Sequence, residues 1–157
     1  MSKAAEGKSG PQTREYETKS AAGTVAIGRK LVDLLAPPRL MILRGDLGAG
    51  KTTLVKGIAT ALGAAEPDEV TSPTFSLIHE YAGTLDGREV KLLHLDLYRL
   101  DAERQLDSLG LEEMQTPDAL ILVEWGEKFK SIRKRADGEV VITSQGGDTR
   151  KIVVTLN

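Results

Sequence analysis

The residues from Gly45 to Thr52 could bind phosphate groups. They read Gly-Asp-Leu-Gly-Ala-Gly-Lys-Thr, which fits the pattern G-x-x-x-x-G-K-[ST]. The glycines of this pattern let the backbone fold so that successive N–H groups point at phosphate oxygens. Lys51 can reach the β- and γ-phosphates as a positive charge, and the hydroxyl of Thr52 can bind Mg²⁺. The spacing predicts a P-loop that binds a nucleoside triphosphate with magnesium.

Two strand-like segments end in a carboxylate, which such a site also needs. Leu92–Asp96 and Leu120–Glu124 are apolar runs that finish with an acid, as the magnesium-holding strand of a P-loop protein does. If both strands lie near the strand before the loop, the two carboxylates converge on Thr52. One could then hold Mg²⁺ while the other polarises the attacking water, or one could only cap a strand. The residues alone leave the two roles open.

Four nearby features have a functional and a structural interpretation. The segment Thr71–Thr74 could be ordered by the γ-phosphate, or it could be a turn before a strand. His94 shares a strand face with Asp96, although a single histidine is more often structural than catalytic. Trp125 could cover the site, dock a partner or pack in the core. The basic run Lys128–Arg135 could contact RNA phosphates, although such runs usually form a solvated helix face.

Apolar patterns and turn residues place these motifs on a mixture of strands and helices. The mixture predicts an α/β fold: a P-loop NTPase-like three-layer α/β/α sandwich with a mixed, partly antiparallel sheet. The expected elements are an edge strand at Glu15–Lys19, a helix capped by Ser20 and stopped by Pro37-Pro38, a strand at Leu40–Leu43, a helix at Thr52–Leu62 ended by Gly63, a hairpin of Phe75–Tyr81 and Val90–Asp96 around Asp86-Gly87, a helix at Asp101–Leu109, a strand at Leu120–Glu124, and strands at Glu139–Thr143 and Lys151–Leu156 joined at Gly146-Gly147.

Length and composition suggest one soluble domain. Of the 157 residues, 1–14 are almost devoid of apolar side chains and are expected to form a mobile tail before an ATPase domain at 15–157. The chain has no cysteine, which excludes disulfides and thiolate zinc sites, and its net charge of −2 excludes a protein that is basic overall. The longest clean apolar run, Ala119–Val123, is too short to span a membrane. No secretory signal is recognisable, so we expect a cytoplasmic protein without membrane contact.

Missing motifs narrow the class of nucleotide-binding protein. The only asparagine is Asn157, so the guanine-reading motif N-K-x-D is impossible and ATP is favoured over GTP. There is no L-S-G-G-Q stretch, which argues against a transporter-type ATPase. A small-molecule kinase usually closes an arginine-bearing lid over its substrate. The candidate arginines form no obvious lid: they are Arg99, Arg104, Arg133 and Arg135.

Taken in order, the motifs resemble the TsaE (YjeE) family, the bacterial ATPase of tRNA threonylcarbamoyladenosine synthesis. Four segments carry the resemblance, and they span most of the chain between Ser20 and Arg150. They are Gly45–Thr53, Thr71–Phe75, His94–Leu100 and Val123–Trp125.

The resemblance implies a partner and a set of site residues. Members of the family support the TsaB–TsaD complex, which adds a threonylcarbamoyl group to the adenosine after the anticodon in tRNAs reading codons that start with A. Any contact with tRNA is then expected through the complex. The implied ATP contacts are Thr24, Gly48, Ala49, Gly50, Lys51, Thr52, Thr53 and Arg150, with Thr24 and Arg150 near the adenine. The implied Mg²⁺ ligands are Thr52 and Glu124, with Asp96 acting through water, and the implied catalytic residues are Lys51, Asp96 and Glu124.

Two alternatives to this ATPase stay open on the sequence. ATP occupancy alone could control the docking of a binding module, with hydrolysis only releasing it. A small-metabolite kinase would instead make a phosphorylated product in place of free phosphate. We also expect hydrolysis by the isolated chain to be slow, because no evident arginine finger lies in a suitable loop.

Overall fold

Strands that are apolar on both faces form the centre of the sheet. The computed structural model describes residues 12–157 and contains a seven-stranded sheet in the order β1-β7-β6-β2-β5-β4-β3. Its inner strands β6 (Gly138–Ser144), β2 (Arg39–Arg44), β5 (Ala119–Glu124) and β4 (Arg88–Asp96) run parallel. The outer strands β1 (Gln12–Thr18), β7 (Arg150–Leu156) and β3 (Ile78–Leu85) pair antiparallel. The sheet is therefore mixed, as predicted.

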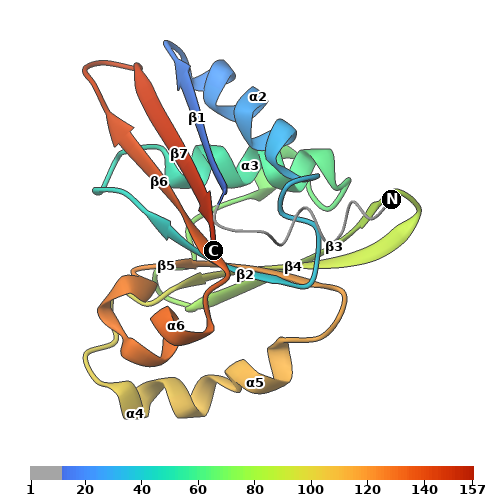
Figure 1. The fold of residues 1–157 in the computed structure, drawn as a ribbon, viewed down its shortest axis with the longest axis vertical. Helices are drawn as coiled ribbons and strands as arrows, with labels where there is room; N and C mark the ends of the chain where they lie inside the picture. The colour runs from blue at the N-terminus through green and yellow to red at the C-terminus, as the bar shows by residue number, and fades with distance from the viewer. Residues whose placement is uncertain (1–11) are drawn as a thin grey trace.

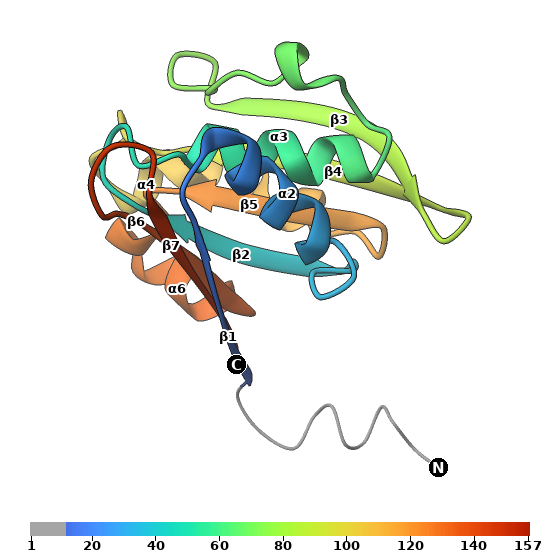
Figure 2. The same cartoon turned by 90° about the horizontal axis from the view of Figure 1, so that it is seen from above.

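Helices cover both faces of this sheet (Figures 1 and 2). One layer contains α2 (Ala21–Leu31) and α3 (Lys51–Ala61), and the other contains α4 (Glu103–Leu106), α5 (Leu111–Met114) and α6 (Lys130–Arg135). Single-turn 3₁₀ helices are η1 (Pro67–Glu69), η2 (Asp107–Leu109) and η3 (Gly126–Lys128). Alternate residues of β2 enter two separate cores, with Met41 and Leu43 on the α2–α3 side and Leu40 and Ile42 on the other. This confirms the three-layer sandwich.

The same alternation decides which way the acidic strand ends point. In β4, Val90 and Leu92 belong to the core under α2 and α3, so His94 and Asp96 lie on that face by the two-residue period of a strand. In β5, Leu120 and Leu122 place Glu124 on the same face. Asp96 and Glu124 are direct neighbours in the register between β4 and β5. Both acids therefore end adjacent parallel strands beneath the layer that contains α3.

Several local predictions are confirmed. The Ser20 hydroxyl caps α2 by accepting a hydrogen bond from the Gly23 amide at 3.0 Å. Gly63 has φ 65° and ends α3 in a Schellman motif, in which the amides of Gly63 and Ala64 donate to the carbonyls of Thr60 and Ala59. Asp86 and Gly87 both have positive φ, 52° and 80°, as a type I′ hairpin turn requires.

The first strand of the chain and the first strand of the hairpin begin at other residues than predicted. β1 begins at Gln12 rather than Glu15, because its pairing with β7 uses backbone groups and needs no apolar side chain. Gln12–Arg14 are thus part of a strand, and the rest of the expected tail lies outside the described residues. β3 begins at Ile78 rather than Phe75, because Leu77 has φ 71° and its amide closes a turn onto the Pro73 carbonyl.

The helical layer on the far side of the sheet is more broken than predicted. The helix expected at Asp101–Leu109 begins at Glu103. The amides of Asp101 and Ala102 donate hydrogen bonds to the Gln105 side-chain oxygen, which caps the helix at that point. It tightens into η2 and stops at Gly110, whose φ is 72°. Helices α2 and α3 have eleven residues each, and among residues 12–157 no helix is long and apolar enough to cross a bilayer.

Candidate nucleotide-binding site

The loop between β2 and α3 has the backbone shape that the motif predicts. Gly48 and Gly50 have φ of 80° and 107°, values that side chains disfavour, and the Ala49 amide turns back to the Asp46 carbonyl at 3.0 Å. A Cβ on Gly45 would lie 2.7 Å from the Ile142 carbonyl oxygen of β6, so only glycine fits against that strand. The loop thus delivers its amides to the N-terminus of α3, an arrangement suited to phosphate.

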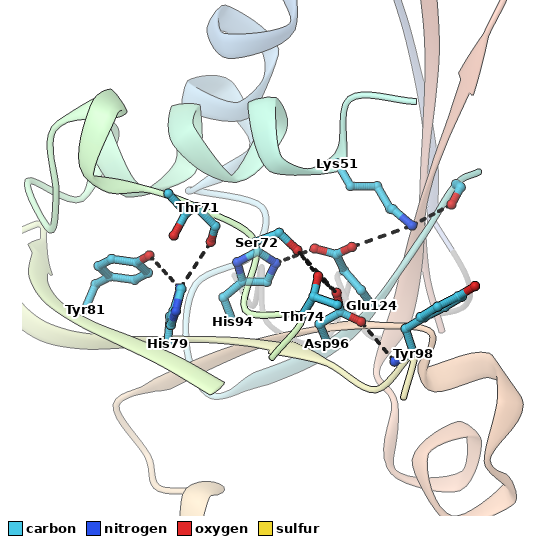
Figure 3. Close-up of polar contacts among 11 residues, drawn as sticks. Lys51, Thr71, Ser72, Thr74, His79, Tyr81, His94, Asp96, Tyr98 and Glu124 are labelled. Atoms are coloured by element: carbon cyan, nitrogen blue, oxygen red, sulfur yellow. Dashed lines mark hydrogen bonds and ion pairs between the residues drawn. The ribbon is translucent and has the colours of Figure 1, made fainter. Parts of the chain in front are cut away.

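Lys51 is the buried cation of this site. It is 6% exposed, and its Nζ donates to the Gly45 carbonyl at 2.6 Å, within the loop itself (Figure 3). The same Nζ lies 3.6 Å from Glu124 Oε1 and 4.6 Å from the centre of the Trp125 ring. The loop, the end of β5 and the tryptophan after it therefore meet at one ammonium group.

Asp96 accepts hydrogen bonds from two hydroxyls and one amide. Ser72 Oγ and Thr74 Oγ1 lie 3.2 and 3.0 Å from Oδ2, and the Tyr98 amide lies 2.9 Å from Oδ1 (Figure 3). The segment at 71–74 is therefore more than a turn before a strand, because its hydroxyls bind the carboxylate at the end of β4. Sequence reasoning singled out this segment and Asp96 separately but did not pair them.

Glu124 is held between Lys51 and His94. His94 Nε2 lies 2.6 Å from Glu124 Oε2, and the His94 side chain is fully buried (Figure 3). Its Nδ1 has no hydrogen-bond partner among the described residues. His94 therefore contacts a carboxylate of the site directly.

A second small network holds the other end of the 71–74 segment. His79 Nδ1 lies 3.1 Å from the Thr71 carbonyl oxygen and 3.4 Å from the Tyr81 hydroxyl (Figure 3). Burial raises the pKa of Tyr81 above its usual value, against a smaller lowering by the Thr71 backbone. Both residues belong to β3, so the edge strand fixes where the segment starts and β4 fixes where it ends.

Lys51, Asp96 and Glu124 line one cavity of about 470 Å³. Its walls include the loop, the two acidic strand ends and two aromatic side chains; the lining residues are Leu47, Gly48, Gly50, Lys51, Thr52, Thr53, Ser72, Thr74, Asp96, Tyr98, Glu124 and Trp125. Trp125 and Tyr98 contact each other at 5.2 Å between ring centres, so Trp125 forms a wall of the site. Tyr98 was not predicted as a site residue, although it stands two positions after Asp96.

The oxygen atoms in this cavity suit magnesium. Thr52, Asp96 and Glu124 offer a hydroxyl and carboxylates, the hard ligands that Mg²⁺ prefers. Among residues 12–157, no group of three or more His, Cys, Asp or Glu side chains is arranged to hold a metal by itself. An ion here would therefore need phosphate oxygens or water to complete its shell, as Mg²⁺ in nucleotide sites does.

Two residues expected beside the adenine do not line this cavity. Thr24 is buried within α2, where its hydroxyl lies 3.4 Å from the Ser20 carbonyl oxygen. Arg150 lies against the phosphate loop and donates to the carbonyls of Ala49 and Gly48. The remaining expected contacts, from Gly48 to Thr53, all belong to the loop and the start of α3.

The basic run after Trp125 is largely engaged within the fold. Lys128 Nζ donates to the carbonyls of Tyr98 and Leu100 at 3.0 and 2.8 Å. Arg133 donates to the Glu127 carbonyl, and Arg135 to the side chains of Gln115 and Glu112. These contacts favour the interpretation of the run as a helix face over that of an RNA-binding patch.

Known proteins are similar to this chain in sequence and in fold. The family model described as threonylcarbamoyl adenosine biosynthesis protein TsaE matches residues 18–152. The tRNA threonylcarbamoyladenosine biosynthesis protein TsaE of Bacillus subtilis is 36% identical over 141 residues, which are 90% of this chain and 84% of that protein. The protein of the same name from a Nostoc species is 42% identical over 110 residues, 68% of this chain and 64% of that protein. The crystal structure of Bacillus subtilis YdiB superposes with a TM-score of 0.66 at 31% identity, covering 94% of this chain and 87% of that one.

Proposed function

The chain belongs to the TsaE family, and from this premise we propose that it is a Mg²⁺-dependent ATPase that supports the threonylcarbamoyl modification of tRNA. The observation that carries the proposal is the meeting of the phosphate loop, Lys51 and two carboxylates in one cavity. The proteins named TsaE supply the pathway, the synthesis of threonylcarbamoyladenosine in tRNA. The site supplies the chemistry, which is the binding and hydrolysis of a nucleoside triphosphate.

Each part of the cavity has a place in this proposal. Lys51 Nζ, which lies on the Gly45 carbonyl, turns to the β- and γ-phosphates and stabilises the charge that develops there. Thr52 and Glu124 would hold Mg²⁺, and Asp96 would act on it through a water molecule. The ion, when bound with the nucleotide, neutralises charge on the phosphate oxygens. Hydrogen bonds from Ser72 and Thr74 keep the Asp96 carboxylate oriented.

A partner is expected to complete the site. None of the residues that line this cavity is an arginine, the side chain that speeds hydrolysis in many P-loop proteins. Leu47, Phe75 and Tyr98 are exposed apolar side chains in or next to the cavity wall, and such side chains favour a protein contact. We propose the TsaB–TsaD complex as that partner, with tRNA reached through it.

Phosphate release from Mg-ATP tests this function. The purified chain should release phosphate slowly by itself and markedly faster with a cognate TsaB–TsaD complex. Lys51→Ala should lose ATP binding and stimulation together, whereas Lys30→Ala, at an exposed lysine near the end of α2, should behave like the parent. No stimulation by a complex that demonstrably binds the chain would overturn the partner-completed mechanism.

Two further results would redirect the proposal. If Glu124→Ala binds ATP and supports normal multiple-turnover modification, hydrolysis is dispensable and the chain is a nucleotide-gated binding module. If ATP consumption gives a phosphorylated small molecule instead of free phosphate, the chain is a kinase. The three outcomes are separated by following phosphate, modified tRNA and metabolites in the same reaction.

A further inference from the structure

Arg150 holds the phosphate loop through two of its backbone carbonyls. Its Nε donates to the Ala49 carbonyl at 2.5 Å and its Nη2 to the Gly48 carbonyl at 3.3 Å. Its Nη1 lies 2.6 Å from the Gly147 carbonyl oxygen and 3.0 Å from that of Thr149, both in the turn between β6 and β7. One guanidinium group therefore joins the phosphate loop to the turn of a hairpin about one hundred residues further along the chain.

These contacts fix peptide planes that matter for phosphate binding. A trans peptide unit is planar, so its N–H and its C=O point in opposite directions. The carbonyl of Ala49 shares its plane with the amide of Gly50. Because Arg150 holds this carbonyl, the Gly50 amide is turned to the opposite side, and Gly50 lines the cavity that contains Lys51 and Thr52.

The loop needs such an external support. Gly48 and Gly50 flank Ala49 with positive φ, and glycine reaches many other conformations at little cost. Holding the loop before the ligand arrives removes an ordering cost from binding. Arginine suits this role because its rigid fork can serve several carbonyls at once, which the single ammonium of lysine cannot do.

We propose that Arg150 is a positioning residue that keeps the phosphate loop in its phosphate-binding shape, and that it does not act on the nucleobase. The inference rests on the proposed function, because it assumes that the loop binds a nucleotide. It replaces the expectation, taken from the family resemblance, that Arg150 lies near the adenine. In the structure all three guanidinium nitrogens are already engaged with backbone carbonyls.

The test compares ATP with inorganic tripolyphosphate, which has the phosphates but no base. Dissociation constants for both, with Mg²⁺ present, are measured by calorimetry for the parent chain, Arg150→Ala and Arg150→Lys. We expect both variants to bind both probes roughly tenfold more weakly, which is the scale of one charge-assisted hydrogen bond. Lys151→Ala is the matched control, because it is the next residue of β7 and its side chain is paired with Glu15 at 3.5 Å, away from the loop.

Every outcome either supports or overturns the positioning role of Arg150. A loss seen with ATP but not with tripolyphosphate would place Arg150 on the base and overturn the inference, as would unchanged affinity for both probes. A parent chain that binds neither probe would overturn the proposed function, and this inference with it. Unfolding midpoints without ligand check that the variants are folded. If Arg150→Ala does not fold, Arg150→Lys decides alone: full affinity would overturn the inference, and loss for both probes would support it.

Discussion

The two carboxylates of the site are held by different kinds of partner. Asp96 receives hydroxyl and amide hydrogen bonds from segments on either side of it in the chain. Glu124 lies between a lysine and a fully buried histidine. Removing the donor from a buried carboxylate leaves it without compensation for its lost water, at a cost of about 1–3 kcal/mol. We therefore expect His94 to affect ATP hydrolysis and stability by holding Glu124 in place.

Replacement of His94 tests this at the scale of one residue. His94→Leu removes the donor at nearly constant size, so we expect the rate of ATP hydrolysis to fall about tenfold and the unfolding free energy to fall by about 1–3 kcal/mol. His94→Gln can place an N–H near the position of Nε2 and should restore most of the rate. Glu89→Gln, at an exposed position of the same strand β4, is the control and should keep the parent's rate. Equal rates for His94→Leu and His94→Gln would contradict the role.

At the scale of elements, the position of α3 depends on close contact with α2. A Cβ on Gly57 would lie 2.0 Å from the Val25 carbonyl oxygen, and one on Gly28 would lie 2.4 Å from the Leu54 carbonyl oxygen. The two glycines bring the helix backbones together beneath the start of α3, which carries Lys51 and Thr52. The contact with α2 therefore helps to place the helix whose first residues are Lys51 and Thr52.

Gly57→Ala should therefore destabilise the protein, although alanine is the better helix former. The backbone contact has to open, and overpacking of this kind costs about 1–3 kcal/mol. The measurement is chemical unfolding of parent and variant. The control is Ala26→Gly at an exposed position of α2, which should cost about 1 kcal/mol through helix propensity alone. A gain in stability for Gly57→Ala would show that the helices are not held in this contact.

In the helical layer that contains α4, α5 and α6, one set of hydrogen bonds depends on pH. The Ser131 hydroxyl and amide donate to Glu103 at 2.8 and 3.2 Å, and they lower the pKa of that carboxyl below its ordinary value of 4.5. A lowered folded-state pKa adds stability above the unfolded-state pKa, and this is lost as the pH falls through the folded-state value. Melting temperatures of the parent and Glu103→Gln should therefore differ at pH 7 and converge as the pH falls through the folded-state pKa, which lies below 4.5. Glu113→Gln, also exposed in this layer, should show no such convergence.

For the whole molecule, ligand binding should appear as added stability. A ligand at one hundred times its dissociation constant adds about 2.7 kcal/mol, which corresponds to a rise of roughly 5–10 °C in a chain of this size. We expect Mg-ADP to raise the melting temperature by this amount. Chelation of Mg²⁺ should remove part of the gain, since Thr52, Asp96 and Glu124 suit the ion.

Melting temperatures of two variants with Mg-ADP show whether the added stability comes from binding in this cavity. Lys51→Ala should show almost none of it, and Asp96→Asn should keep the part that remains after chelation. A gain of equal size in Lys51→Ala would mean that the nucleotide binds elsewhere. A gain that does not respond to chelation in the parent would mean that Mg²⁺ is no part of the complex.

Features that depend on neighbouring residues could be predicted from the sequence. The phosphate loop, the capped start of α2, the end of α3 at Gly63 and the turn at Asp86-Gly87 follow from local backbone chemistry. The period of two in β4 and β5 also tells which side chains share a face. The short helix α5, with four residues, carries too little of a helical period to be predicted.

The contacts between side chains from distant parts of the sequence could not be predicted, because they depend on the folded arrangement. Asp96 and Glu124 become neighbours because β4 and β5 pair in one particular register, and a shift of one residue would turn either acid to the other face. The contacts of Glu124 with His94, of Asp96 with Ser72 and of Arg150 with Ala49 join residues 30, 24 and 101 positions apart. Such contacts depend on strand order and on the packing of both cores, which are set by the burial of the whole chain rather than by any one motif.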